Sequence, residues 1–382
     1  MNLWRDVFVP PIRAWVQPFR RHLVRDERYL FFTQKWPVER FGKVAVWHRH
    51  AVQLKGARID FSKADLAAAP GQAPCTAMKT KPGFLQVEDP PESIPPLPLH
   101  LGPWMKSLGS VSSDAVDESV PVALAVCRYE ERNLFHAMSE IYAAWLYLRY
   151  LGHSPEQARI LLIDDRDDSP MDEWYRVLFG SLAHGRHLHG VHAFGELLLG
   201  IPGYGSSLYP LHQPIDHGAE PFRRFVLERF GIEPRVSKSV QRIVIISRPE
   251  IDLDGRCLRR RFANEAELIR WAKEVHPGAD VSALDLGRLS LREQLLVINE
   301  TDLLIGMHGA GMTHAMFLPE AARVFEMFPR DFPPSNDHFR NITLWRKLPY
   351  QRWQNLLPSR ESPDGATLIP ERLFKRRLRV LG

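Results

Sequence analysis

The chain has 382 residues, of which 45% are hydrophobic and 25% are charged, and its 50 lysines and arginines outnumber its 45 acidic residues by five. This is the composition of a globular protein with two or three domains of ~150 residues each. Three cysteines are too few for a disulfide framework or a four-thiolate zinc site. No apolar run approaches the ~18 residues of a membrane-spanning helix. The small positive excess is not that of a dedicated nucleic-acid-binding protein.

The first part of the chain predicts little regular structure. Arginine and aromatic side chains alternate over the first thirty residues, and nine prolines fall within residues 70–103. We expect residues 1–118 to form an irregular extension packed on the first domain, and residues 351–382 to form a basic tail. These basic and aromatic ends can rest on an anionic membrane, and the alternative is a packed arm with a solvated tail. Because acid, proline and arginine interrupt the N-terminus, no signal peptide is predicted.

From residue 119 onward, short apolar runs alternate with segments of helical periodicity. The predicted strands are 120–127, 158–165, 242–248, 301–309 (ending in a turn) and 323–329. The predicted helices are 134–151, 171–179, 221–230, 265–275, 291–299 and 311–318. Such alternation indicates βαβ units with parallel strands and helices on both faces. We therefore predict an α/β protein with two Rossmann-like domains, residues 119–235 and residues 240–350, facing each other across a cleft.

Two of these helices begin with the spacing of a capping box. Asn264 precedes Glu267 by three residues, and Ser290 precedes Glu293 by three residues. In a capping box the first side chain bonds a backbone N–H of the helix, and the acid bonds back. We expect both pairs to fix the start of their helices.

The most informative segment joins a strand to a short helix. The strand runs into His308-Gly309-Ala310-Gly311. Glycines let backbone N–H groups approach a ligand, and a helix N-terminus favours negative charge, so the segment suits a pyrophosphate. Glu326, at the end of the next strand, can accept hydrogen bonds from ribose hydroxyls. The alternative is a tight turn without a ligand, because the third glycine of the dinucleotide fingerprint is absent.

A second segment places arginines at another strand end. Ser247 and Arg248 close the strand 242–248, and Arg260 lies in the arginine-rich stretch that follows. Ligands of open α/β sheets bind beyond the carboxyl ends of strands, where arginines can neutralise a diphosphate without a metal ion. The alternative is a solvated arginine face.

A third candidate lies near the start of the helix 134–151. His136 and Glu140 share one face, opposite the apolar stripe of this helix. Such a pair can supply a general base and the group that orients it. The alternative is an exposed pair that stabilises the helix slightly.

Two further groups contain residue types that bind metals. The histidines of the first have no ligand spacing of a known site, and they are His184, His187, His189 and His192. The acidic run at 164–168 follows a strand, where such residues cap a helix more often than they bind a cation. We expect no metal ion at either group.

Taken together, these motifs resemble glycosyltransferase family 61. The matching pieces occur in the family's order: NLFHAMSE (133–140), VIISR (244–248), RRFANEAEL (260–268), SLREQLLVINETDLLIGMHGAGMTHAMFLP (290–319) and RVFEMFP (323–329). The resemblance implies a GT-B arrangement and an inverting transfer from a nucleotide-diphosphate sugar, with no further cofactor. The substrate-binding residues it implies are Asn133, Ser247, Arg248, Arg260, His308, Gly309, Ala310, Gly311, Met312, Thr313 and Glu326.

The resemblance also implies how the acceptor is used. A glycan or lipid-linked glycan would enter from the first domain, where His136 or Glu140 would remove its hydroxyl proton. We expect a bacterial-type cytoplasmic enzyme of surface polysaccharide biosynthesis that touches the inner face of the membrane through its basic ends. The alternatives are a catalytically silent nucleotide- or carbohydrate-binding module on the same fold, and a Rossmann oxidoreductase.

Overall fold

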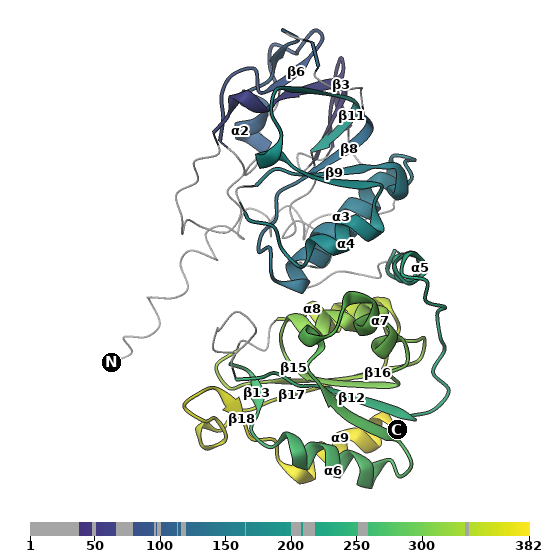
Figure 1. The fold of residues 1–382 in the computed structure, drawn as a ribbon. Helices are drawn as coiled ribbons and strands as arrows, with labels where there is room; N and C mark the ends of the chain where they lie inside the picture. Colours follow the sequence, from purple (N-terminus) through teal and green to yellow (C-terminus); the bar gives the residue numbers. More distant parts are fainter. Residues whose placement is uncertain are drawn as a thin grey trace.

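The structure, a computed structural model, forms an α/β protein with two large sheets, one above the other in Figure 1. It describes residues 38–47, 51–65, 79–94, 97, 101–112, 114–115, 120–164, 166–199, 208, 218–250, 259–332 and 336–382. The basic and aromatic segment over the first thirty residues lies outside these ranges, so its membrane contact stays a prediction.

The first sheet has nine strands, and its centre is parallel. The parallel strands, in spatial order, are β10 (Ser181–His184), β9 (Arg159–Leu162), β8 (Val120–Val126) and β11 (Val191–Leu199). In sequence order they read 3-2-1-4, which matches the first four strands of the Rossmann order 3-2-1-4-5-6. The predicted βαβ organisation of this part of the chain is confirmed.

The predicted irregular extension is wrong for the residues that the structure describes. They form the other side of the first sheet, where β1 (Val38–Phe41), β2 (Val44–Trp47), β3 (Ala51–Asp60) and β6 (Leu85–Val87) pair antiparallel and β7 (Gly109–Ser110) pairs parallel with β6. Between them lie β4 (Ala64–Asp65), β5 (Lys79–Thr80) and the helix α2 (Leu101–Lys106). The central partner of β3 is β11, more than 130 residues later. Because the partner strand is so distant, the local sequence gives little sign of this pairing. The prolines between the short strands make the strands harder still to predict.

The second sheet is parallel throughout. Its spatial order is β14 (Asp280–Leu284), β12 (Arg242–Ile246), β15 (Leu303–Met307), β16 (Arg323–Phe328) and β17 (Tyr350–Gln354). In sequence order this is 2-1-3-4-5, the flavodoxin-like order of doubly wound sheets. The strand of this sheet that follows β12 in the chain, β14, lies on one side of it, and the later strands lie on the other side. The order of the sheet therefore switches between β12 and β15. A ligand of such a sheet binds beyond the carboxyl ends of these two strands.

The predicted basic tail is also wrong. Residues 351–382 complete β17, pair β18 (Ala366–Thr367) with β13 (Arg261–Phe262), and end in the helix α9 (Glu371–Leu381). The apolar side chains of α9 recur every three or four residues and are buried against α6 (Glu265–Val275) and the sheet: Phe374, Leu378 and Leu381. The many arginines of this helix mask the apolar stripe in a composition-based prediction.

The two expected capping boxes have different outcomes. Ser290 and Glu293 form the box at the start of α7 (Leu291–Asn299). Asn264 does not cap α6. Its side chain instead accepts from the N–H of Ile369 at 2.9 Å and donates to the Ile369 carbonyl oxygen at 3.0 Å, which connects the segment before α9 to the start of α6.

One hydrophobic cluster joins the two sheets. The helices between them are α3 (Leu134–Tyr150), α4 (Asp172–Leu178), α5 (Ala219–Arg229), α7, α8 (His338–Trp345) and the 3-10 helix η7 (Ala310–Phe317). Their apolar faces meet, as where the ring of Trp174 stacks on that of Phe317 at 5.9 Å. The expected cleft is therefore largely filled among the described residues, and the GT-B arrangement stays a prediction.

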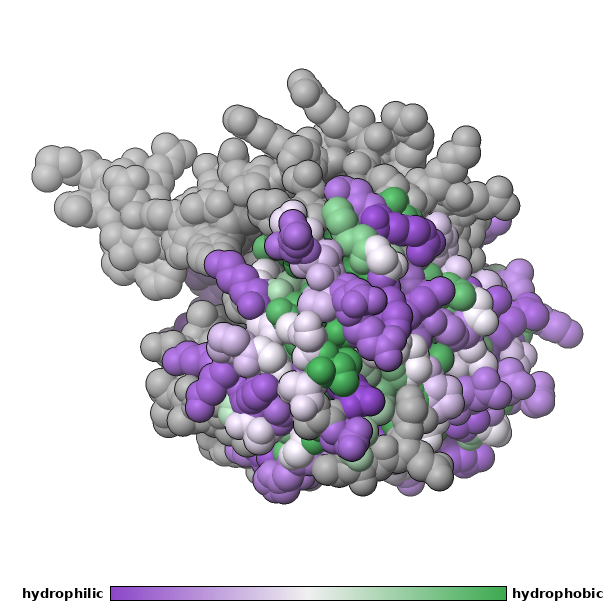
Figure 2. All heavy atoms as spheres, turned by 90° about the horizontal axis from the view of Figure 1, so that it is seen from above, coloured by the Kyte–Doolittle hydropathy of each residue, from purple (hydrophilic) through white to green (hydrophobic). Residues whose placement is uncertain are grey.

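No helix among the described residues is long and apolar enough to cross a bilayer. Figure 2 views the molecule from above Figure 1, where the described surface mixes many hydrophilic side chains with isolated hydrophobic ones. Scattered apolar side chains of this kind are usual on globular proteins.

Candidate functional site

A cavity of about 330 Å³ lies where the order of the second sheet predicts a ligand. Its wall includes the ends of β12 and β15 and the start of α4, which belongs to the first half of the protein, the part that contains the first sheet. The lining residues of the first half are Arg132, Leu134, Pro170, Met171 and Glu173. The polar and glycine residues that line it from the second half are Ser247, Arg248, Asp285, Gly287, Ser290, Gln294, Gly309, Gly311 and His314. The structure thus brings together two segments that the sequence analysis singled out separately.

The glycine at position 309 makes room for two guanidinium groups. A Cβ atom at Gly309 would lie 2.8 Å from Nη1 of Arg248 and 3.9 Å from Cζ of Arg260. The first distance is too short for any side chain without moving Arg248. The backbone at Gly309 is extended, with φ of 164°, so space and not conformation requires glycine here.

These two guanidinium groups form a positively charged wall. Nη1 of Arg248 is buried and has no hydrogen-bond partner among the described residues. Burial and the nearby charge of Arg260 lower the pKa of Arg248 to about 10, against the opposing effect of Asp285. Burial also lowers the pKa of Arg260. Two partly buried cations of this kind are suited to bind an anion with two charged groups.

The position of Arg260 is held by the local backbone. Its φ is +63°, in the left-handed region that non-glycine residues rarely adopt. Its N–H donates to the carbonyl oxygen of Gly365 at 3.0 Å, and its guanidinium lies over the ring of Phe332 at 5.1 Å. Backbone strain that persists in this way is typical of functional sites.

The other residues predicted around this site have mixed outcomes. Ala310 lines the cavity, and Ser247 lines it while its hydroxyl donates to Glu265 at 3.0 Å. Met312 and Thr313, on η7, are fully buried and do not line the cavity. The predicted helix after Gly309 is a 3-10 helix, whose first N–H groups have no acceptor within the helix.

His308 and Glu326 form a buried pair away from the cavity wall. Nδ1 of His308 lies 2.5 Å from Oε1 of Glu326, and the hydroxyl of Tyr350 donates to Oε2 at 2.5 Å. Three aromatic rings surround the imidazole, those of Phe328, Phe332 and Phe339. Both carboxylate oxygens thus have protein partners and Glu326 is fully buried, so the structure does not offer it to a ribose in the cavity.

The helix α3 is buried on all sides over most of its length, so the alternative of an exposed pair of His136 and Glu140 is wrong. The helix lies between the first sheet and η7, so the face opposite the apolar stripe is covered as well. Glu140 accepts from the N–H of Tyr129 at 2.6 Å and from the hydroxyl of Tyr175 at 2.9 Å. These bonds make Glu140 a structural anchor instead of a free base.

His136 keeps the features of a base. Its Nε2 lies 3.7 Å from Glu130, and its ring lies 4.6 Å from that of Tyr129. Burial lowers the pKa of His136, although Glu130 opposes the shift, and this favours the neutral imidazole. Asn133 accepts from the N–H of Phe135 at 3.0 Å and so caps α3, which gives it a local structural role.

A group of residues that sequence reasoning missed holds the far end of η7. Arg346 donates to the carbonyl oxygens of Met316 and Leu318 at 2.6 and 3.1 Å, and Arg223 donates to that of Phe317 at 3.4 Å. Both guanidinium groups also contact Glu220, at 2.9 and 3.1 Å. They come from α8 and α5, so no local sequence pattern could have connected them.

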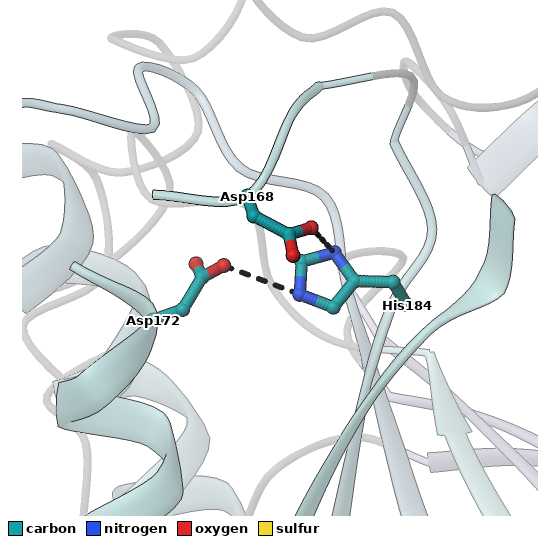
Figure 3. Close-up of side chains that lie close together, drawn as sticks. All are labelled: Asp168, Asp172 and His184. Carbon is teal, nitrogen blue, oxygen red and sulfur yellow. Dashed lines mark ion pairs between the residues drawn. The ribbon is translucent and has the colours of Figure 1, made fainter. Parts of the chain in front are cut away.

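The acidic run after β9 meets a histidine, as Figure 3 shows. Nδ1 of His184 lies 3.4 Å from Asp168, and Nε2 lies 3.2 Å from Asp172. The possible ligand atoms of these three residues lie within 4.8 Å of one another, close enough to bind one cation. However, the imidazole lies between the two carboxylates, and buried Arg128 also donates to Asp172 at 3.0 Å and to Asp164 at 2.8 Å. Ion pairing accounts for this cluster.

Comparison with known proteins identifies relatives of the chain. The family model described as Glycosyltransferase 61 matches residues 134–325, half of the chain. A β-1,2-xylosyltransferase of Oryza sativa subsp. japonica is 23% identical over 288 residues, which cover 67% of this chain and 51% of that protein. An EGF domain-specific O-linked N-acetylglucosamine transferase of Drosophila melanogaster is 33% identical over 133 residues, 35% of this chain and 24% of that protein.

The matched region contains most of the candidate site described above. It includes α3, the end of β12, the glycine segment after β15 and the greater part of the cavity wall. The chain spans about half the length of the plant relatives that it matches. On the extent of the family match, the chain belongs to the glycosyltransferase 61 family.

Proposed function

We propose that the chain transfers a sugar from a nucleotide-diphosphate sugar to a hydroxyl group of a glycan or another acceptor. The observation that carries this proposal is the pair of guanidinium groups of Arg248 and Arg260 beside Gly309, at the strand ends where doubly wound sheets bind ligands. Membership of a family whose named relatives transfer xylose and N-acetylglucosamine supports it.

The cavity supplies what the departing diphosphate needs. Negative charge grows on the diphosphate as its bond to the sugar breaks, and fixed positive groups stabilise that charge most when they are already in place. Arg248 and the first N–H groups of η7 are such groups at the cavity wall, and Arg260 adds its charge from beside Gly309, although it is not among the lining residues. They can give the stabilisation that a metal ion gives in other transferases.

The reaction we propose is a single displacement. The acceptor oxygen attacks the anomeric carbon from the face opposite the diphosphate, which leaves with the bonding electron pair. The hydroxyl proton passes to the imidazole of His136, on the helix α3 whose Leu134 lines the cavity. One base and one anion site are sufficient, and the anomeric configuration is inverted.

We further propose the setting of this activity. The chain is a bacterial-type enzyme of surface polysaccharide biosynthesis with a GT-B arrangement, acting in the cytoplasm on a glycan or lipid-linked glycan. Contact with the anionic inner face of the membrane is supported by the outer face of α9, where Arg372, Arg376 and Arg379 are exposed.

The test is a panel of UDP-, GDP-, ADP- and dTDP-sugars. The expected result is a rise in melting temperature with at least one member, and transfer to a hydroxyl acceptor with inversion, read by proton NMR of the product. A thermal shift without any nucleotide release, including release by hydrolysis, would identify a silent binding module. A response to NAD(P)H alone would favour an oxidoreductase, and no shift with any sugar nucleotide would overturn the proposal.

A further inference from the structure

A buried histidine lies under the anion site. His314 is on η7 and lines the cavity together with Gly311 and Gln294. Its Nδ1 lies 2.9 Å from the carbonyl oxygen of Gly311, and its Nε2 lies 3.0 Å from Oε1 of Gln294. The amide nitrogen of Gln294 donates to the carbonyl oxygen of Leu289 at 2.8 Å. Both ring nitrogens therefore face oxygen atoms that can only accept a hydrogen bond.

A neutral imidazole cannot satisfy this arrangement. It carries one N–H group, so one of its two nitrogens would present a lone pair to an oxygen lone pair at about 3 Å. Turning the amide of Gln294 by half a rotation would give Nε2 a donor, but it would then place Oε1 against the carbonyl oxygen of Leu289. With the ring in this position, each neutral tautomer keeps at least one repulsive contact for either orientation of the Gln294 amide. The imidazolium, with two N–H groups, keeps none.

The surroundings of the ring nevertheless oppose the imidazolium. Burial lowers the pKa of His314 to about 4, and both ring partners are uncharged. The charged side chains that share the cavity wall are Arg132, Glu173, Arg248 and Asp285, and those at the far end of η7 are Arg223, Arg346 and Glu220. Without an anion, the hydrogen-bond geometry and the electrostatics of this site favour opposite protonation states.

We propose that His314 binds a proton when a diphosphate enters the cavity, and so becomes a further cationic group of the anion site. Two negative phosphoryl groups beside Arg248 change the sign of the potential at the ring, because charges interact strongly in a site that excludes water. The imidazolium then satisfies Gly311 and Gln294 together and adds positive charge under the diphosphate. This inference rests on the proposed function, since it needs a diphosphate ligand in this cavity.

The test measures protons and not activity. UDP-xylose and UDP-N-acetylglucosamine are diphosphate diesters, which do not titrate near neutral pH themselves. Calorimetric titration in PIPES and in imidazole buffer at the same neutral pH gives the number of protons bound with the ligand. We expect uptake approaching one proton per site. By linkage, affinity then increases as pH falls, by about tenfold per pH unit where uptake is complete.

Two variants act on His314 in opposite ways. His314→Gln removes the titrating ring but keeps an amide donor, and Gln294→Glu places a carboxylate at Nε2 that protonates the ring before any ligand arrives. Both should bind the ligand with less than about a quarter of the wild-type proton uptake. His276→Gln, on a partly buried histidine after α6 and away from the cavity, is the matched control and should keep the full uptake.

The possible failures are distinguishable. Absence of binding by every sugar nucleotide at any pH would overturn the proposed function itself. Binding with no proton uptake, or uptake that persists in His314→Gln, would leave the diphosphate site in place and overturn the role of His314. The wild-type measurement alone decides the first two outcomes, even if a variant does not fold.

Discussion

At the scale of single residues, the candidate site depends on charges that lack full compensation from the described residues. Arg248 is partly buried beside Arg260, and its Nη1 lacks a hydrogen-bond partner among the described residues. Protein interiors rarely keep such groups, because a buried unpaired charge destabilises the folded state. Their presence at a strand end is therefore better explained by a ligand than by folding.

We predict that Arg248→Ala weakens binding of a sugar nucleotide by about 1.5–3 kcal/mol, or roughly 10- to 150-fold. The melting temperature of the unliganded protein should not fall, because a poorly compensated charge is removed with the side chain. Calorimetric titration and thermal unfolding measure the two effects. Arg270→Ala, an exposed arginine on α6, is the control. Equal affinity of Arg248→Ala and wild type would show that the arginine does not contact the ligand.

His136 and Glu140 should respond differently to substitution. We predict that His136→Ala lowers kcat with little change in KM, since a base acts in the chemical step. Glu140→Ala should instead lower the free energy of unfolding by about 1–3 kcal/mol, because the Tyr129 N–H and the Tyr175 hydroxyl lose their acceptor. Steady-state kinetics and urea unfolding separate the two. A stable Glu140→Ala protein that has lost only kcat would reverse our assignment.

The pH dependence of the reaction tests the same base. Burial lowers the pKa of His136, so the neutral ring that accepts a proton persists below the ordinary titration range of histidine. We predict that kcat/KM falls on acidification only when the pH passes below that ordinary range, and that this limb is missing from the residual activity of His136→Ala. A pH profile that is identical for both proteins would show that another group is the base.

At the scale of elements, the short helix η7 joins the site to the rest of the fold. Its first residues line the cavity, and its last carbonyl groups receive hydrogen bonds from Arg223 and Arg346. Cations at the carbonyl end of a helix are favourable because of its dipole. The position of the anion site thus depends on arginines at the opposite end of the same element.

We predict that Arg346→Met lowers the free energy of unfolding by about 2–4 kcal/mol, because two buried carbonyl oxygens lose their donors. Urea unfolding measures this loss. The control is Arg340→Met on the same helix, whose side chain is half exposed and which should change stability little. Equal stability of the two variants would mean that water replaces the guanidinium of Arg346.

Prediction from sequence succeeded where an element carries its own signal. The parallel strands β8, β9, β12, β15 and β16 are short apolar runs flanked by amphipathic helices, so periodicity alone found them. The antiparallel strands β1–β3 were missed because β3 pairs with β11, far along the chain. The helix α9 was missed because its three buried apolar residues are interspersed with arginines. The glycine segment and Arg248 could be singled out in the sequence because ligands of this class of fold bind beyond the carboxyl ends of the strands. The partners of Glu326 and Glu140 are set by packing between elements, which the sequence does not display.

At the scale of the whole molecule, helices and sheets alternate: α2 packs on the outer face of the first sheet, a layer of helices lies between the two sheets, and α6 with α9 lies below the second sheet in Figure 1. Each helix layer covers a sheet face that would otherwise be exposed to water. The C-terminal helix is thus part of the core of the second sheet, although it is the last segment of the chain.

We predict that deletion of residues 371–382 prevents folding of the second sheet. Phe374, Leu378 and Leu381 each contribute about 1.5–3 kcal/mol by burial, so together they account for about 5–9 kcal/mol, as much as the whole stability of many domains. Soluble yield and circular dichroism measure the result. The double variant Arg372→Glu and Arg376→Glu, on the exposed face of the same helix, should fold normally. A soluble, folded deletion protein would contradict the layer assignment.

The cluster shared by the two sheets has a consequence for protein engineering. Trp174 and Phe317 come from opposite sides of the junction, yet each ring forms part of the other's surroundings. A chimera that joins the first sheet of this chain to the second sheet of a relative would combine surfaces that were not selected together. Recombination of family members should therefore exchange the exposed loops around the cavity and keep this aromatic junction from a single parent.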